Sequence, residues 1–307
     1  MEQTISRNIL KKQARTQKVK RTLIYHAFLI PGVILLILFK YIPLVGGIAM
    51  AFQDFKSAAG FFGYQEWVGF ENFEYIFSLP DIWRIVGNTV YIALWKMVLL
   101  IVVPVIVALL LNEVKNVKYR NFLQTLMILP HFISWVLLAG VYQNVLSSDS
   151  IFYQLTGQLV LTDSDQYVSF TIISEVLKEY GFSSIIYMAA IAGIDQSQYE
   201  AARLDGCGRF RAMFKITLPN IKHVILLMSL LSLGNIFSAG FDQIYNTYNS
   251  AVVSRGEILD TLIYTMGMSA KEYSLSAALG LMKSCFSTVL MAIAYFFAWK
   301  KEGYHVF

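Results

Sequence analysis

The chain has few charged residues for its length. Only 15% of its 307 residues are Asp, Glu, Lys or Arg, whereas 56% are apolar, and the mean hydropathy is +0.55. Soluble globular domains carry about 25% charged residues. This shortage of charge excludes an ordinary soluble domain and predicts a polytopic membrane protein.

Cysteine is also scarce. Cys207 falls in a hydrophilic segment and Cys285 lies within an apolar run, so the two thiols are not expected to meet. The sequence therefore predicts neither a disulfide framework nor a cysteine metal site, and it disfavours redox chemistry.

Motifs for catalysis and for ATP binding are missing as well. The four histidines are widely separated in the sequence, and there is no His-Glu-x-x-His motif. No Gly-Lys dipeptide occurs, so the chain has no phosphate-binding loop of the Gly-x-x-x-x-Gly-Lys-Ser/Thr type. We expect a non-catalytic protein with no cofactor or metal of its own.

The apolar residues form about six long runs. Each run reaches the roughly 20 residues that a helix needs to cross a bilayer, and none alternates as a barrel strand would. The sequence therefore predicts an all-α fold, a polytopic bundle of about six transmembrane helices. The expected spans are Leu23 to Ala51, Ile85 to Leu111, Phe122 to Leu146, Phe170 to Ile194, Val224 to Tyr248 and Ala277 to Trp299.

The distribution of Lys and Arg predicts the orientation of these spans. Seven basic residues lie between Arg7 and Arg21, ahead of the first span, and others follow the second, fourth and sixth spans. Acidic residues such as Glu66 and Asp163 occupy alternate loops. Because basic loops remain on the cytoplasmic side, both termini of a multi-pass protein of the cytoplasmic membrane are expected inside.

These features divide the chain into four parts. We expect a basic cytoplasmic tail that contacts membrane lipid, then a first span with an external segment, then a membrane core, then a second cytoplasmic tail. The boundaries are residues 1–22, 23–84, 85–300 and 301–307.

A hydrophilic loop between the fourth and fifth spans contains an unusual pattern. Phe210, Met213 and Phe214 have helical spacing, which predicts a short amphipathic helix with these three side chains on one face. Gly206 lies where two short helices must turn sharply, and Pro219 marks the start of the fifth span. This loop is expected to be a compact helix-turn-helix rather than a plain linker.

The loop also carries a spaced motif. Glu200-Ala201-Ala202 is followed after three residues by Gly206 and, after nine more, by Ile216-Thr217-Leu218-Pro219. This spacing resembles the EAA loop of the permease subunits of bacterial ABC importers. The resemblance implies that the loop docks on a separate ATPase, with Glu200 as the polar anchor, the two alanines as the packing surface and Gly206 as the turn. The implied coupling residues are Glu200, Ala201, Ala202, Asp205, Gly206, Ile216, Leu218 and Pro219.

Two further strings favour a sugar as the substrate. The segments 129–135, Leu-Pro-His-Phe-Ile-Ser-Trp, and 240–246, Gly-Phe-Asp-Gln-Ile-Tyr-Asn, resemble the oligosaccharide and polysaccharide subgroup of these permeases. The resemblance implies a second, homologous permease in a heterodimer, P-loop ATPase subunits that hold Mg-ATP, and an extracytoplasmic sugar-binding protein. It implies no nucleic-acid partner.

Charged residues within the spans mark a candidate substrate path. Such residues are costly in lipid and usually face protein or a wet cavity. Glu175, Lys178 and Glu179 lie along one helical face, and polar or charged residues recur in the fifth and sixth spans. An equally good explanation is internal pairing, with Lys178 neutralising its neighbours or Lys283 meeting Asp242. The path candidates are Glu175, Lys178, Glu179, Asn235, Asp242, Gln243, Tyr245, Asn246 and Lys283.

An ion-coupled secondary sugar transporter is the alternative function. It would explain charged residues inside the membrane, but such carriers more often have ten or twelve spans with inverted repeats. It would also leave the spaced cytoplasmic loop without a purpose.

Overall fold

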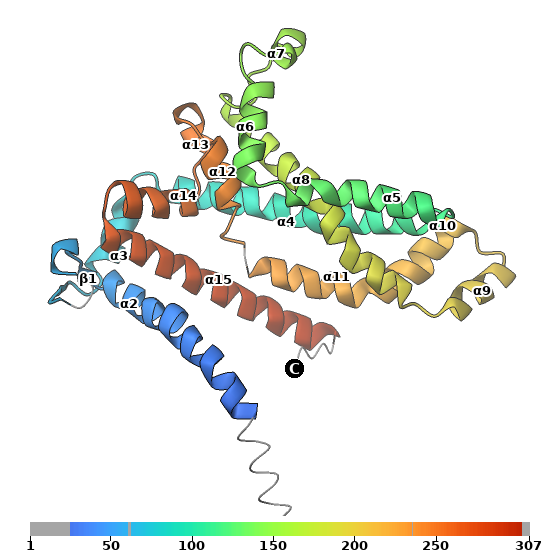
Figure 1. Cartoon of the computed structure of the whole chain (residues 1–307), viewed down its shortest axis with the longest axis horizontal. Coiled ribbons are helices and arrows are strands. Elements are labelled where there is room, and N and C mark those ends of the chain that lie inside the picture. Colours follow the sequence, from blue (N-terminus) through green and yellow to red (C-terminus); the bar gives the residue numbers. More distant parts are fainter. Residues whose placement is uncertain (1–24, 61–62, 235, 303–307) are drawn as a thin grey trace, which may run out of the picture. The chain divides into compact units, whose positions relative to one another are not determined.

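The computed structural model describes residues 25–60, 63–234 and 236–302 (Figure 1). Within these residues the regular structure is helical except for one short antiparallel pair, β1 (Gln53–Asp54) and β2 (Glu66–Trp67). The predicted all-α class is confirmed. The basic tail 1–22 and residues 303–307 of the second tail lie outside the described residues. Met1–Asn72 and Phe73–Phe307 are two compact units.

The first unit contains a helix that runs from Tyr25 to Ala51. Its middle is a π-helical turn, η1 (Ile37–Tyr41), followed by α2 (Ile42–Ala51). The helix continues through this turn and through Pro43. Pro43 cannot donate a hydrogen bond to the carbonyl four residues earlier and its ring crowds that carbonyl, and a wider turn just before the proline accommodates both effects.

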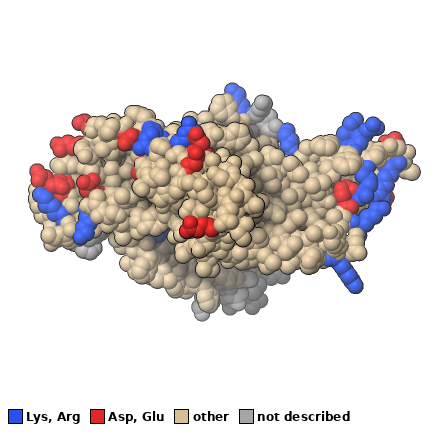
Figure 2. All heavy atoms as spheres, turned by 90° about the horizontal axis from the view of Figure 1, so that it is seen from above, with Lys and Arg blue, Asp and Glu red and all other residues tan. Residues whose placement is uncertain are grey.

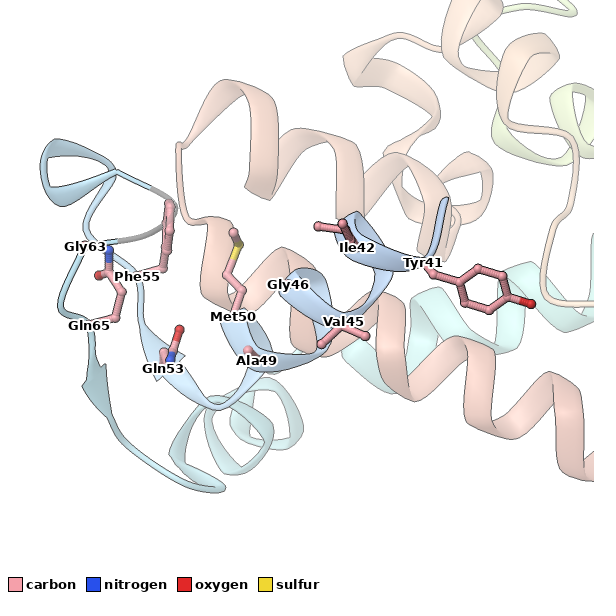
Figure 3. A pocket seen from close by; sticks show the side chains of 10 residues that line it. All are labelled: Tyr41, Ile42, Val45, Gly46, Ala49, Met50, Gln53, Phe55, Gly63 and Gln65. Atoms are coloured by element: carbon pink, nitrogen blue, oxygen red, sulfur yellow. The ribbon is translucent and has the colours of Figure 1, made fainter. Parts of the chain in front are cut away.

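The chain after α2 folds back within the same unit. Gln65 is buried and its amide donates to the carbonyls of Lys56 and Gly60, at 3.2 and 3.0 Å. Asn72 donates to the carbonyls of Ala51 and Gln53, at 3.0 and 3.1 Å. A hollow of about 450 Å³ remains between α2 and this loop (Figure 3).

The second unit is built around two long helices, α4 (Ile82–Asn112) and α8 (Ser164–Ala192), which pack along each other (Figure 1). Two apolar clusters hold their neighbours against them. One joins Ile92 and Ile172 to Ile244, and the other joins Val105 and Tyr187 to residues of the loop that follows α8. The remaining helices are α3 (Glu71–Ser78), α5 (Val117–Ile128), η3 (Leu129–Phe132), α6 (Trp135–Val145), α7 (Ile151–Thr156), α9 (Gln196–Leu204), α10 (Arg209–Ala212), η4 (Met213–Thr217), α11 (Leu218–Leu233), α12 (Phe241–Thr247), η5 (Ser250–Val252), α13 (Val253–Gly256), α14 (Leu259–Tyr264), η6 (Thr265–Ser269) and α15 (Tyr273–Glu302).

Four described helices are long and apolar enough to cross a membrane, and a bent pair brings the count to five. The four are Tyr25–Ala51, Ile82–Asn112, Arg209–Leu233 and Tyr273–Phe297. α8 has the length, at 29 residues, but Glu175, Lys178 and Glu179 fall in its middle. The predicted number of about six is reached only if the bent pair and the charged α8 are both counted.

Two expected spans are not single helices. In the third, Val117–Phe132 and Trp135–Val145 meet at an angle of 93°. In the fifth, α11 ends at Leu233 and α12 begins at Phe241, so a continuous helix from Val224 to Tyr248 is wrong. Gly240 before α12 has a φ of +93°, which is incompatible with helix propagation and comfortable only for glycine.

The fifth span also begins earlier than expected. One helix runs from Arg209 to Leu233 through the π-helical turn η4. Pro219 lies in the first turn of α11, as the sequence predicts, but α11 continues a helix that already runs from Arg209. As at Pro43, the wide turn directly precedes the proline and relieves the clash with the carbonyl four residues earlier.

The contact between α5 and α8 depends on a glycine, which generates a stability prediction. A Cβ at Gly181 would overlap the carbonyl of Met127. We expect Gly181→Ala to lower the free energy of unfolding by about 1–3 kcal/mol, because neither backbone can yield without shifting its helix. The thermal midpoint of the purified protein in detergent measures this loss.

The control is Gly280→Ala in α15, where a Cβ would meet nothing within 4 Å. This change should leave the midpoint unchanged or raise it, because alanine is the better helix former by about 1 kcal/mol. Equal midpoints for both variants would contradict the close approach of α5 and α8.

Candidate functional site

The loop between α8 and α11 folds as a compact helical unit at one end of the two long helices. Asp195 precedes α9 as its N-cap, and its carboxylate accepts a hydrogen bond from the backbone N–H of Ser197 at 2.9 Å. Hydrogen bonds from the side chain and backbone of Ser197 lower the pKa of Asp195. The carboxylate is therefore ionised at neutral pH and caps the N-terminus of α9.

Gly206 ends α9 in the way that the sequence predicts. Its φ is +72°, and its N–H donates to the carbonyl of Arg203 at 3.1 Å while the N–H of Cys207 donates to Ala202 at 2.8 Å. This pair of bonds is a Schellman motif, which provides hydrogen-bond donors for the last carbonyl groups of the helix and requires a residue in the left-handed conformation. The turn redirects the chain into α10 within three residues.

Side-chain contacts attach the loop to the bundle. The hydroxyls of Tyr199 and Thr217 are 2.8 Å apart, which joins α9 to the π-helical turn. The guanidinium of Arg209 donates to the backbone carbonyl of Glu113 at 2.7 Å and lies 2.5 Å from its carboxylate, at the end of α4. Met213 is buried in the cluster around Val105 and Tyr187. These contacts anchor the loop to both α4 and α8.

The outer surface of the loop is apolar and basic. Leu204, Phe210 and Phe214 are 89%, 74% and 62% exposed. The prediction that Met213 shares a face with the two phenylalanines is wrong, because Met213, Thr217 and Ile221 form the buried stripe. Lys and Arg gather at the same end of this unit (Figure 2). The exposed basic residues of the loop are Arg203, Arg209, Arg211 and Lys215.

The motif residues divide between this surface and the bundle. The exposed ones are Glu200, Ala201, Asp205, Gly206 and Pro219. Ala202, Ile216 and Leu218 are half-buried, and Leu218 packs on the apolar cluster. Their contact with an ATPase stays a prediction.

A polar network links α4, α8 and α12. The ammonium of Lys96, 5% exposed, donates to the carbonyl of Ala239 at 2.7 Å and to the side chain of Gln243, and lies 3.4 Å from Glu175. Gln243 is fully buried and donates to the carbonyl of Thr171 and to Ser174. Glu175 is thus joined to α4 rather than to Lys178.

A second network lies at the bend between η3 and α6. Lys178 donates to the backbone carbonyl of His131 and to Glu179, both at 2.8 Å. Glu179 also contacts Nδ1 of His131 at 2.7 Å, and the imidazole stacks on Phe182 at 3.9 Å. The predicted pairing of Lys178 with a neighbouring carboxylate is present for Glu179 and absent for Glu175.

The third charged pair joins α15 to α14. Lys283 contacts Asp260 and lies 3.0 Å from the hydroxyl of Ser238, in the segment between α11 and α12. The sequence offers Asp242 as the partner of Lys283, but Asp242 is exposed on α12 and Asp260 occupies that position. Short helical segments after α12 bring Asp260 back toward α15, which sequence spacing does not reveal.

α12 presents the remaining path candidates. Tyr245, 45% exposed, stacks on Phe241 at 5.2 Å and meets Tyr264 edge-on at 4.7 Å. Asp242 is exposed, and the backbone of Asn246 accepts a hydrogen bond from Gln143 at 3.0 Å. Asn235 lies outside the described residues.

Sequence reasoning did not find several members of these networks. His131 and Phe241 lie in the strings that resemble sugar permeases, so those strings contained a usable signal. For Asp260, Ser238 and Tyr264 the sequence contained no such signal, because their partners are 19 or more residues away and are reached only through bends in the chain.

Comparison with known proteins agrees with this arrangement. Residues 100–301 match the family of binding-protein-dependent transport system inner membrane components. The protein LplB of Bacillus subtilis (strain 168) is 37% identical over 294 residues, covering 93% of this chain and 92% of LplB. The polygalacturonan/rhamnogalacturonan transport system permease protein YteP, from the same organism, is 34% identical and also covers 93% of this chain and 92% of YteP.

A solved structure has the same fold over nearly the whole chain. It is a bacterial ABC transporter involved in the import of the acidic polysaccharide alginate, and it superimposes with a TM-score of 0.85 at 30% identity, covering 93% of this chain and 98% of the other. A second structure shows the bacterial alginate transporter in complex with an alginate pentasaccharide-bound periplasmic protein, with a TM-score of 0.83 at 29% identity over 92% and 96% of the two chains. The chain therefore belongs to the family of inner membrane components of binding-protein-dependent transport systems.

Proposed function

We propose that this chain is the permease subunit of an ATP-driven importer and forms half of the path for an oligosaccharide or polysaccharide fragment. An extracytoplasmic binding protein delivers the sugar to an outward-facing cavity. A separate ATPase then closes on ATP and, through the loop from Glu200 to Pro219, converts the path to an inward-facing one. The sugar crosses chemically unchanged.

The form of the loop between α8 and α11 carries the proposal of an ATPase partner. Leu204, Phe210 and Phe214 expose apolar surface in a segment that is otherwise basic, and such a patch marks a protein interface. The Schellman turn at Gly206 and the contacts of Tyr199 and Arg209 make the loop rigid. A rigid, exposed loop transmits displacement, whereas a flexible one would absorb it.

The class of sugar rests on the relatives. YteP is named for polygalacturonan and rhamnogalacturonan, and the superimposed structures are of an alginate importer. These names favour a glycan over an amino acid or a metal ion. They also favour this importer over the ion-coupled carrier that the sequence alone left open.

The partners and topology follow from the same proposal. The chain pairs with a second, homologous permease in a heterodimer, binds P-loop ATPase subunits that hold Mg-ATP, and receives sugar from an extracytoplasmic binding protein. Both termini lie in the cytoplasm of the bacterial cell. The proposal also includes the division of the chain into four functional parts, residues 1–22, 23–84, 85–300 and 301–307.

Among the path candidates, α12 offers the best sugar contact. Tyr245 with Phe241 and Tyr264 forms an aromatic surface on which a pyranose ring can stack, and the exposed Asp242 can accept hydrogen bonds from hydroxyls. Asn246 is half-buried beside them. The other described candidates act as supports in this conformation, because they bond to other parts of the chain; these are Glu175, Lys178, Glu179, Gln243 and Lys283.

Purification of the tagged chain from its native host tests the proposal. We expect a P-loop ATPase and a second permease to co-purify in detergent, and the reconstituted complex to take up a labelled oligosaccharide only with ATP and the binding protein. Uptake by the chain alone, driven by an ion gradient without any ATPase, would support the carrier instead.

The turn at Gly206 provides a sharper test of coupling. Gly206→Val forces a β-branched residue to a φ of +72°, at a cost of about 1–3 kcal/mol, although nothing lies within 4 Å of its Cβ. The strained loop should lose its docked shape, so sugar transport and sugar-stimulated ATP hydrolysis should be abolished while membrane insertion stays normal. Both activities are measured in vesicles containing the assembled complex.

The matched control is Gly206→Asn, because asparagine tolerates the left-handed conformation. It should retain most of the parental transport. If the Asn variant is as inactive as the Val variant, added bulk rather than backbone conformation is responsible and the turn argument fails.

A further inference from the structure

The break between α11 and α12 lies in apolar surroundings. Ile236 and Ala239 are buried in one cluster with Ile92 of α4 and Ile172 of α8. The carbonyl of Ala239 lies between the end of α11 at Leu233 and the N-cap of α12 at Gly240, so neither helix pairs it. An unpaired carbonyl in such a place is costly, so the break needs a donor from elsewhere in the protein.

Lys96 is that donor. Its ammonium has three hydrogens and three acceptors around it: the carbonyl of Ala239, the side-chain oxygen of Gln243, and Glu175. The distance to the carbonyl of Ala239 is 2.7 Å, whereas the distance to the Glu175 carboxylate is 3.4 Å. The ammonium is therefore closer to the backbone of the break than to its counter-charge.

The start of α12 is built around this ammonium. A Cβ at Gly240 would lie 2.7 Å from the Lys96 nitrogen and 3.3 Å from Glu175, so only glycine leaves room for both. Gln243 lies on the first turn of α12. Its side-chain oxygen accepts a hydrogen bond from Lys96, and its side-chain nitrogen donates to the carbonyl of Thr171 and the hydroxyl of Ser174 on α8. Lys96 and Gln243 thus join the first turn of α12 to both long helices.

We propose that Lys96 is a positioning residue, which sets the direction in which α12 leaves the break through its bonds to Ala239 and Gln243. α12 carries Tyr245 and Asp242, so this inference rests on the proposed function for its consequence in transport. The counter-charge of Glu175 serves a different purpose, which is to make a buried ammonium tolerable. The two purposes can be separated by experiment.

Two variants separate them. Glu175→Gln removes the carboxylate and leaves the nitrogen of Lys96 beside Ala239 and Gln243. The lone ammonium is expected to lower the stability and the yield of assembled complex, but not to move α12 in the complexes that assemble. The double variant K96M/E175Q removes both charges, so it avoids a lone buried charge, but it also removes the donor to the break. Each is made in the full chain, assembled with its co-purifying subunits in nanodiscs, with results normalised to assembled complex.

The first readout is the position of α12. Spin labels are placed at Asp242→Cys on α12 and at Val102→Cys, an exposed site on α4, after Cys207 and Cys285 are replaced by serine. We expect E175Q to give the parental distance distribution, and K96M/E175Q to give a shifted or broadened one. This readout does not depend on which sugar is carried.

The second readout is transport, in complexes without the labels. K96M/E175Q should lose about tenfold or more of the parental rate, as expected for loss of a hydrogen bond from a charged group. E175Q should stay within a few-fold of the parental rate. The control is Arg255→Ala, which removes an exposed ion pair with Asp165 that includes no residue of the segment between α11 and α12, and it should leave the rate unchanged.

Two results would overturn the proposal. If K96M/E175Q matches the parental chain in label distance, Lys96 only neutralises Glu175. If E175Q displaces α12 as far as K96M/E175Q does, the carboxylate is the positioning group. Should the double variant fail to assemble, Gly240→Ala crowds the same ammonium and is expected to displace α12, and parental distances in that variant would count against the proposal.

A failure of the proposed function has a separate signature. A parental complex that carries no oligosaccharide would end the proposal of sugar import, while the label distances would still decide whether Lys96 positions α12.

Discussion

The second unit depends on one constraint: a helix that breaks inside an apolar bundle must find partners for its free carbonyl groups. Irregular backbone survives at membrane depth only where protein supplies those partners. Here lysine side chains supply them. Lys96 reaches the carbonyl of Ala239 and Lys178 reaches that of His131, whereas Lys283 reaches a side-chain hydroxyl, that of Ser238, in the segment between α11 and α12. Each lysine also meets a carboxylate, as a buried cation requires.

This constraint gives the charged residues within the spans a structural explanation. Ionisable residues inside spans suggest a substrate path, and the sequence leaves sugar contact and internal pairing equally open. The contacts favour a structural purpose for most of these groups, because the lysines are occupied by backbone and carboxylate oxygens. The broken helix then allows α12 to project Tyr245 and Asp242, whose side chains are exposed. The charged side chains therefore stabilise the break between α11 and α12, and the break allows α12 to expose its aromatic surface.

The sequence predicts what depends on composition or on local chain geometry. The shortage of charge indicates a helical membrane protein, and the glycine at 206 with its neighbours indicates a turn that the structure contains. The sequence does not predict which residues meet through tertiary contacts. The apolar run from Val224 to Tyr248 is long enough for one span, and its break is stabilised by Lys96, more than 140 residues away from its acceptors. Phe210 and Met213 have helical spacing, but only the packing of Met213 against Tyr187 decides which side faces inward.

The same two helices that hold the breaks also hold the cytoplasmic loop. α4 carries Lys96 in its middle and Glu113 at its end, where Arg209 of the loop is bound. α8 carries the acceptors of Gln243 in its first half and, further along, Tyr187, against which Met213 packs. α4 and α8 pack along each other, so together they connect the loop at one end to the supports of α12. In the importer we propose, an ATPase acting on the loop would therefore move the supports of α12, and no separate linkage between motor and sugar surface is needed.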